Sequence, residues 1–118
     1  MNKYLTISTA NDLVRIIPEC VVYIASDGNY STLVQTDGEM RMLSYQLGHI
    51  ESLIENQLGV HPFVRIGKSL IINCSYIYYI NVPKQKLILS DTKTFNHQLS
   101  ASKEALKQLK DHIIEKGL

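Results

Sequence analysis

The chain has 118 residues, of which 45% are hydrophobic and 19% are charged, so it suits one domain with one core. It contains neither an apolar run near the ~20 residues of a membrane span nor the apolar core of a signal peptide. Cys20 and Cys74 form no CxxC pair and match no histidine spacing, which argues against a disulfide scaffold, a zinc site or a redox motif. We therefore expect a single domain over residues 1–118, in the cytoplasm.

The net charge of +1 conceals an uneven distribution of charged residues along the chain. Residues 1–62 carry three basic and seven acidic side chains, a balance of −4. Residues 63–103 carry six basic side chains against Asp91 alone, a balance of +5. The six are Arg65, Lys68, Lys84, Lys86, Lys93 and Lys103. This segment suggests an anionic partner, but lysines that protect exposed strand edges would give the same pattern.

Most of the chain consists of short runs of β-branched and aromatic residues, which predict strands separated by turns. In chain order, the predicted strands are residues 4–7, 13–17, 21–25, 30–36, 63–66, 70–73, 77–80, 86–89 and 94–99. Turn signals follow the third and fourth strands at Asp27-Gly28-Asn29 and Asp37-Gly38.

Two helices interrupt and end this series of strands. Between residues 44 and 58 apolar residues recur every three or four positions, with Ser44 as the expected N-cap and Gly59 at the C-terminal end. A last helix is predicted to begin at Ser102. The expected fold is mainly β, with antiparallel sheets, one internal amphipathic helix and a C-terminal helix.

The tripeptide Gly67-Lys68-Ser69 matches the end of a phosphate-binding P-loop. A P-loop needs a glycine where this chain has Pro62, and a helix where residues 70–72 predict a strand. Nucleotide binding is therefore not expected. The tripeptide is interpreted as a turn between two strands that presents Lys68.

Catalytic and metal sites have little support in the sequence. The histidines are scattered without an i,i+4 metal pair, at His49, His61, His97 and His112. Tyr76, Tyr78 and Tyr79 could stack bases in an RNA-binding sheet, but a structural role fits their alternation better. We expect no enzyme activity, no metal and no cofactor.

The chain presents, in order, VVYIASDGNYSTLVQTDG, a short amphipathic helix, FVRIGKSLIINCSYI, a strand pair and a final segment opening SASKEAL. Over nearly its whole length this order resembles the LytTR DNA-binding domain of bacterial response regulators. The most specific part is Phe63, Arg65, Ser69 and Asn73 in the pattern F-x-R-x-H-R-S-x-x-x-N. The resemblance implies elongated antiparallel β-sheets whose loops at one edge enter grooves of double-stranded DNA. It thus implies sequence-directed DNA binding for transcription regulation.

The resemblance also assigns DNA-binding residues to three loops. They are Asp27, Asn29 and Tyr30 in the first loop, Gly67 and Lys68 after Arg65 in the second, and Ser102 and Lys103 in the third. Gly67 replaces the family's His, and Lys68 and Lys103 replace arginines, so two planar guanidinium groups become point charges. A weaker or different sequence preference is expected. Asn73, at a strand end, is interpreted as a turn residue or a residue that bonds the backbone and so shapes the site.

The resemblance implies three kinds of partner and no membrane. They are double-stranded DNA, a receiver domain or sensor protein on another chain or segment, and a second copy on repeated half-sites. The alternative is a protein-interaction or dimerisation module that uses the acidic first half and the tyrosine-rich strands. Basic side chains gathered on the loop edge would favour DNA, whereas scattered ones would favour the alternative.

Overall fold

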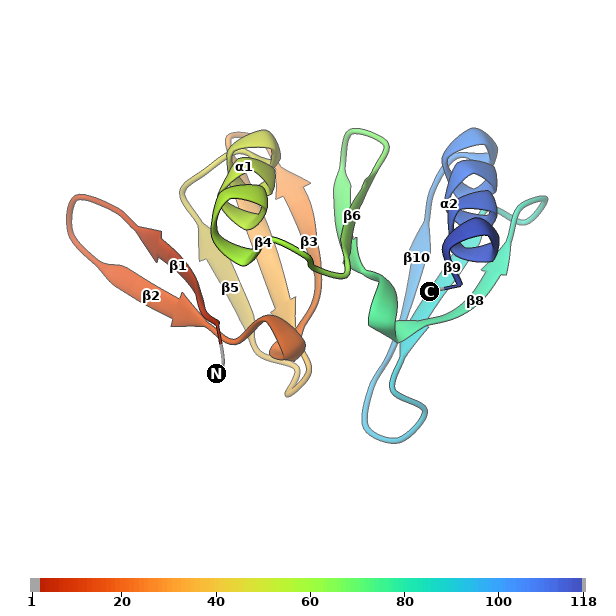
Figure 1. Cartoon of the computed structure of the whole chain (residues 1–118), viewed down its shortest axis with the longest axis horizontal. Helices are drawn as coiled ribbons and strands as arrows, with labels where there is room; N and C mark the ends of the chain where they lie inside the picture. The colour runs from red at the N-terminus through yellow and green to blue at the C-terminus, as the bar shows by residue number, and fades with distance from the viewer. Residues whose placement is uncertain (1–2, 118) are drawn as a thin grey trace.

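A computed structural model describes residues 3–117, which form ten β-strands in three antiparallel sheets and two α-helices. The largest sheet has the order β5-β4-β3-β7-β6, and the second has the order β10-β9-β8. Strands β1 and β2 form a separate hairpin at one side of the molecule (Figure 1). The strand bounds are β1 Leu5–Ser8, β2 Leu13–Ile16, β3 Val21–Asp27, β4 Tyr30–Gln35, β5 Met40–Leu43, β6 Phe63–Ile66, β7 Leu70–Asn73, β8 Ile77–Asn81, β9 Lys86–Ser90 and β10 Asn96–Ser100.

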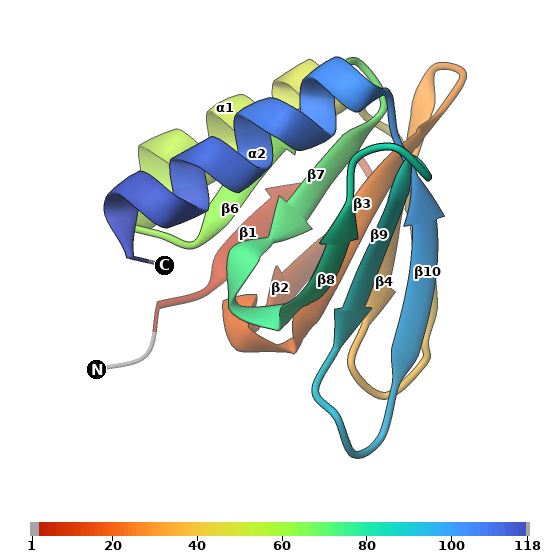
Figure 2. The ribbon, with the colours of Figure 1, turned by 90° about the vertical axis from the view of Figure 1, so that its right-hand side faces the viewer.

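The helices are α1, Leu47–Leu58, and α2, Lys103–Lys116. Both lie on the same side of the molecule and begin at the same end (Figures 1 and 2), but they pack into different cores, on opposite faces of the five-stranded sheet. The mainly β fold with one internal and one C-terminal helix agrees with the prediction. Two short 3-10 helices, η1 Pro18–Cys20 and η2 Cys74–Tyr76, connect β2 to β3 and β7 to β8.

The five-stranded sheet is covered on both faces, which explains the three consecutive apolar residues of β7, Leu70–Ile72. Neighbouring residues of a strand point to opposite faces, and both Ile71 and Ile72 are buried. Ile71 belongs to a core formed with α1 and the β1–β2 hairpin. Ile72 belongs to a second core formed with the three-stranded sheet and α2. The long axis of the molecule measures 44 Å, against 34 and 26 Å for the other two.

Helix α1 begins later than the sequence predicts. The N-cap is Gln46 rather than Ser44, and Gln46 makes no side-chain capping bond. Residues 44–46 stay outside the helix because Tyr45 is tied on two sides: its carbonyl accepts a hydrogen bond from Ser31 Oγ at 2.7 Å, and its hydroxyl donates to the carbonyl of Ser8. Gly59 does end the helix, with a φ of 65°.

Several strand ends differ from the prediction by one or two residues, and the differences at β5 and β10 have a clear physical reason. Strand β5 was not predicted, because its sequence MRML has no β-branched or aromatic residue. Strand β10 begins at Asn96, two residues after the predicted start. The delay follows from Asp91, whose Oδ1 accepts hydrogen bonds from the backbone N–H groups of Lys93, Thr94 and Phe95 and so extends the preceding turn.

Candidate nucleic-acid interface

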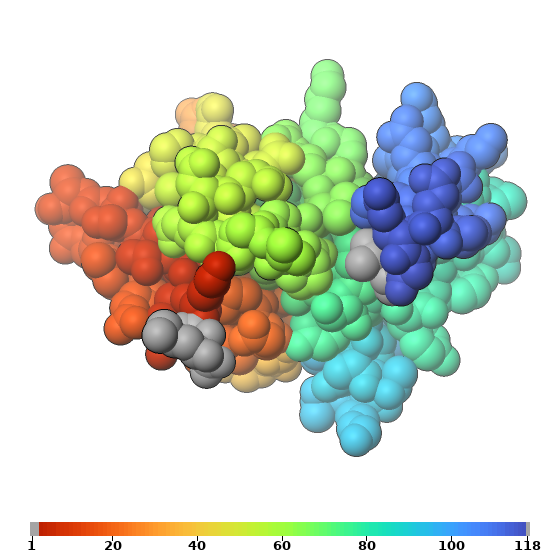
Figure 3. All heavy atoms as spheres, in the orientation of Figure 1, coloured from red at the N-terminus to blue at the C-terminus, as the bar shows by residue number. Residues whose placement is uncertain are grey.

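Three loops that are far apart in the sequence lie at one end of the molecule (Figures 1 and 2). They are the β3–β4 turn, the β6–β7 turn and the start of α2, and we call this end the loop edge. Seven of the eight predicted site residues lie in these loops and are exposed: Asp27, Asn29, Tyr30, Gly67, Lys68, Ser102 and Lys103. Figure 3 shows the β6–β7 turn projecting furthest, between the other two.

The β3–β4 turn is tight and is anchored to the start of α1. Asp27 pairs with Tyr30, so the turn consists of Gly28, which has a φ of 64°, and Asn29. The side-chain oxygen of Asn29 accepts a hydrogen bond from Gln46 Nε2 at 3.2 Å. Among residues 3–117 the amide N–H groups of Asn29 have no acceptor, so they can donate to a ligand, beside a Tyr30 ring that is 48% exposed.

The β6–β7 turn consists of residues 67–69 between the paired residues Ile66 and Leu70. Gly67 has a φ of 61°, a conformation that favours glycine. The carbonyl of Ser69 accepts a hydrogen bond from the backbone N–H of Ser26 at 2.9 Å, which joins the base of this turn to β3. The ammonium group of Lys68 is carried at the tip.

Arg65, the eighth predicted residue, lies beneath the loop edge between α1 and the β6–β7 turn. Its Nη1 is 3.1 Å from Glu51 Oε1, and its Nη2 donates to the carbonyl of Lys68 at 3.1 Å. The side chain is 28% exposed. Through these two bonds Arg65 holds the β6–β7 turn against α1. A direct contact between Arg65 and DNA stays a prediction.

At the third loop, Ser102 is the N-cap of α2. Its Oγ accepts a hydrogen bond from the backbone N–H of Ala105 at 3.1 Å, which leaves the hydroxyl proton free to donate. The N-terminus of a helix carries a partial positive charge that favours an anion. The exposed Lys103 adds a full positive charge next to it, and Glu104 follows.

The basic side chains of residues 63–103 gather toward the loop edge. Lys68 and Lys103 lie on it, and Lys84 and Lys86 lie in or next to the β8–β9 turn at the same end (Figure 2). Arg65 is paired with Glu51 below the edge. Only Lys93 of the six lies at the opposite end, in the β9–β10 turn. This distribution is the one that favours an extended anion over scattered strand-edge lysines.

Asn73 bonds the backbone, as predicted. The side chain is 1% exposed, its Nδ2 donates to the carbonyl of Val21 at 2.9 Å, and its Oδ1 accepts from the backbone N–H of Ser75 at 2.9 Å. It therefore joins β7 to β3 and to η2, at the end of β7 away from Lys68.

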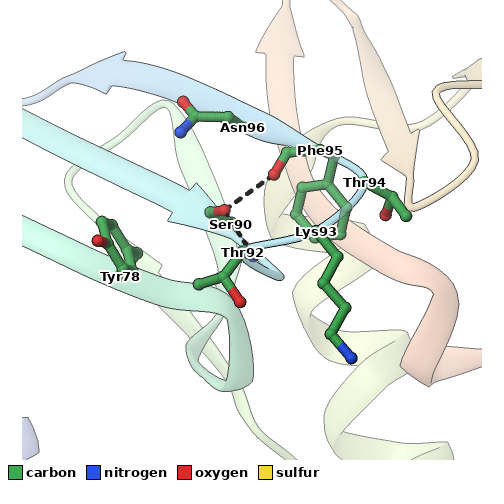
Figure 4. Close-up of a pocket in the computed structure, with 7 residues that line it drawn as sticks. All are labelled: Tyr78, Ser90, Thr92, Lys93, Thr94, Phe95 and Asn96. Atoms are coloured by element: carbon green, nitrogen blue, oxygen red, sulfur yellow. Dashed lines mark hydrogen bonds between the residues drawn. The ribbon is translucent and has the colours of Figure 1, made fainter.

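A concave surface at the other end is lined by Tyr78, Ser90, Thr92, Lys93, Thr94, Phe95 and Asn96 (Figure 4). The hydroxyl groups of Ser90, Thr92 and Thr94 are hydrogen-bonded within the turn. Ser90 Oγ donates to the carbonyl of Phe95 at 2.9 Å and accepts from the Thr92 N–H at 2.8 Å. The Thr94 hydroxyl and three backbone N–H groups bond Asp91 and hold the pKa of its carboxyl well below the usual range. These hydrogen bonds of the β9–β10 turn account for the shape of the surface.

Three of the four histidines, His49, His61 and His97, have structural surroundings. His61 accepts from the Phe63 N–H and contacts Glu55 Oε1 at 2.9 Å, a pairing that the sequence spacing did not indicate. His49 stacks on Tyr45, and His97 packs against Tyr23 and Phe95.

No group of three or more His, Cys, Asp or Glu that could hold a metal occurs among the described residues. Neither helix of residues 3–117 is long and apolar enough to cross a membrane.

Sequence reasoning missed two residues that support the loop edge. Gln46 holds Asn29, and Glu51 holds Arg65. The partners are 17 and 14 residues apart along the chain, so only the packing of α1 against the sheet brings them together.

Two comparisons with known proteins bear on the fold and the family of this chain. Residues 11–114 match the family model of the LytTr DNA-binding domain. Among solved structures, the fold is similar to the LytTr DNA-binding domain of a Bacillus cereus protein described as a methyl-accepting/DNA response regulator. That similarity has a TM-score of 0.62 at 17% sequence identity and covers 94% of this chain and 96% of the other. No curated protein matched the chain. The resemblance drawn from the sequence is confirmed, and the chain belongs to the LytTr DNA-binding domain family.

Proposed function

We propose that this chain binds double-stranded DNA through its loop edge in a sequence-directed way, and that it regulates transcription rather than catalysing a reaction. The observation that carries this proposal is the convergence of three exposed loops, with Lys68 and Lys103, on one edge of the molecule. DNA-binding families without a recognition helix read grooves with loops or strands.

The dimensions of the molecule suit a duplex. The loops follow one another along its longest axis, which measures 44 Å over the whole molecule (Figure 1). One helical turn of DNA spans about 34 Å, so a molecule of this length lying along the duplex extends over more than one groove. The projecting β6–β7 turn would enter a groove, and the flanking loops would meet the backbone on either side (Figure 3).

The chemistry of the loops divides into two roles. Lys68, Lys103 and the Ser102 hydroxyl, at the N-terminus of α2, suit contacts to phosphate. Asn29 and Tyr30 suit contacts to base edges, because Asn can both donate and accept there. Lysines in place of the family's arginines provide charge without bidentate geometry. We therefore expect much of the affinity to come from phosphate contacts and to depend strongly on salt.

The proposal extends to the setting of this binding activity. Residues 1–118 would act as one DNA-binding unit in the cytoplasm, where bacterial DNA lies. Control would come from a receiver domain or a sensor protein, on another chain or another segment. A second copy would occupy the neighbouring half-site of a repeated target.

Selection from a pool of random-sequence duplexes, repeated at two salt concentrations, tests the proposal. We expect enrichment of related sequences and weaker retention at the higher salt concentration. If the protein retains no duplex at either concentration, DNA binding is excluded. If it retains duplexes without enriching any sequence, the binding is not sequence-directed.

A further inference from the structure

We propose that the β8–β9 turn, residues 82–85, is a fourth DNA contact, in which Lys84 binds a backbone phosphate next to the segment held by Ser102 and Lys103. This inference rests on the proposed function. It enlarges the interface beyond the three loops that the sequence predicts.

The position of the turn is fixed by hydrogen bonds to the residue before Ser102. The backbone N–H of Ala101 donates to the carbonyl of Gln85 at 3.4 Å, and Gln85 Nε2 donates to the carbonyl of Ala101 at 3.3 Å. Strand pairing continues this contact, since Lys86 lies opposite Ser100. The turn that carries Lys84 is therefore held next to Ala101, just before α2, and Figure 2 shows it at the same end of the molecule as the start of α2.

The turn is also rigid. The backbone N–H of Lys84 donates to Asn81 Oδ1 at 2.9 Å, and the N–H of Gln85 donates to the carbonyl of Val82 at 3.0 Å. Gln85 has a φ of 54°, one of two positive values at non-glycine residues in the described chain. Such a conformation has an energetic cost and persists where surrounding bonds enforce it. A fixed turn presents a lysine to a ligand without ordering a loop on binding.

The charge of Lys84 is not neutralised within the protein. Lys84 is exposed, and no carboxylate of residues 3–117 lies within ion-pair distance of its ammonium group. Arg41 and Arg65, by contrast, are paired with Glu39 and Glu51. An exposed, unpaired cation on a fixed turn, beside a helix N-terminus that favours anions, suits a phosphate. Such a contact would strengthen binding to every duplex and carry no sequence information.

The test compares Lys84→Gln with Lys93→Gln, which removes the same charge from the opposite end of the protein. Lys84 and Lys93 each hold their turn through the backbone N–H group, so neither substitution removes a structural side-chain bond. Duplex affinity is measured over a series of salt concentrations. One phosphate contact contributes about 0.9 to the slope of log affinity against log salt. Between about 50 and about 200 mM salt, the affinity ratio of wild type to Lys84→Gln should therefore fall about 3.5-fold.

The expected result is a reduced slope for Lys84→Gln, a wild-type slope for Lys93→Gln, and a restored slope for Lys84→Arg. Lys68→Gln is the positive control and should reduce the slope. If it does so while Lys84→Gln and Lys93→Gln both keep the wild-type slope, this inference is wrong and the proposed function stands. If the wild-type protein shows no salt-dependent duplex binding, the proposed function fails, and this inference fails with it.

Discussion

Gly67, at the tip of the β6–β7 turn, provides a prediction that separates backbone geometry from DNA recognition. Its φ of 61° disfavours any side chain, but a Cβ placed there would have no atom within 4 Å. The cost of Gly67→Ala is therefore strain without a steric clash, which for a left-handed residue is about 1–2 kcal/mol. For a domain of this size, each kcal/mol shifts Tm by roughly 4 °C, so we expect a decrease of about 4–8 °C.

Thermal unfolding of Gly67→Ala and Gly48→Ala gives a matched comparison. Gly48 lies in the first turn of α1 without a positive φ, and its added Cβ would meet Arg65 Nη1 at an ordinary 3.7 Å. Gly48→Ala should therefore raise stability, by up to ~1 kcal/mol. If Gly67→Ala unfolds at the wild-type temperature while Gly48→Ala is stabilised, the strain argument is wrong.

The variant Gly67→His, with the side chain that the family pattern has here, extends the test to recognition. It should lose as much stability as Gly67→Ala, because both variants place a side chain at the same positive φ and have the same backbone strain. A good polar contact to a base edge carries ~1–3 kcal/mol of discrimination. Sharper sequence selectivity for Gly67→His than for Gly67→Ala would show that the glycine removes a base contact. Equal selectivity would show that the glycine serves the backbone and that the turn places Lys68 against phosphate.

Substitutions at three further positions test the supports of the interface. Ser102→Asp should keep the cap of α2 but repel phosphate, whereas Ser102→Ala should lose about 1 kcal/mol of stability; unfolding and duplex binding should therefore rank the two variants oppositely. Asn73→Ala should cost about 2–4 kcal/mol in denaturant unfolding, since it leaves the Val21 carbonyl and the Ser75 N–H without partners, and a cost no larger than that of the exposed Asn96→Ala would contradict this role. Glu51→Ala should weaken duplex binding by up to about fivefold by releasing Arg65 from the β6–β7 turn, a loss of up to ~1 kcal/mol. Glu55→Ala makes the same change in net charge one turn further along α1, so an equal effect of both variants would refute positioning by Arg65.

The sequence predicted features that depend on short spacings. The turn at Gly28-Asn29, the capping role of Ser102 and the strands on both sides of Gly67 each depend on residues within a few positions of one another. The backbone bonds of Asn73 were also inferred, from its place at a strand end.

Features that depend on tertiary packing could not be predicted in this way. Strand β5 forms because β4 offers it an open edge, although its own residues have little preference for a strand. The partners of Arg65 and Asn29 lie on α1, and no local pattern shows which residues of a helix will face a particular turn. The position of the turn that carries Lys84, next to Ala101, likewise arises from the pairing of β9 with β10.

The central claim is that the loop edge is the surface that meets DNA. An NMR titration of the isotope-labelled protein with a selected duplex tests it most directly, because each backbone amide reports separately. We expect the largest shifts in residues 27–30, 67–69 and 101–103, together with residues 82–85 around Lys84, while the signals of residues 91–95 at the opposite end keep their positions. If the shifts centre on the β9–β10 turn or on the concave surface that includes Tyr78, and the signals of the loop edge do not move, the claim is contradicted.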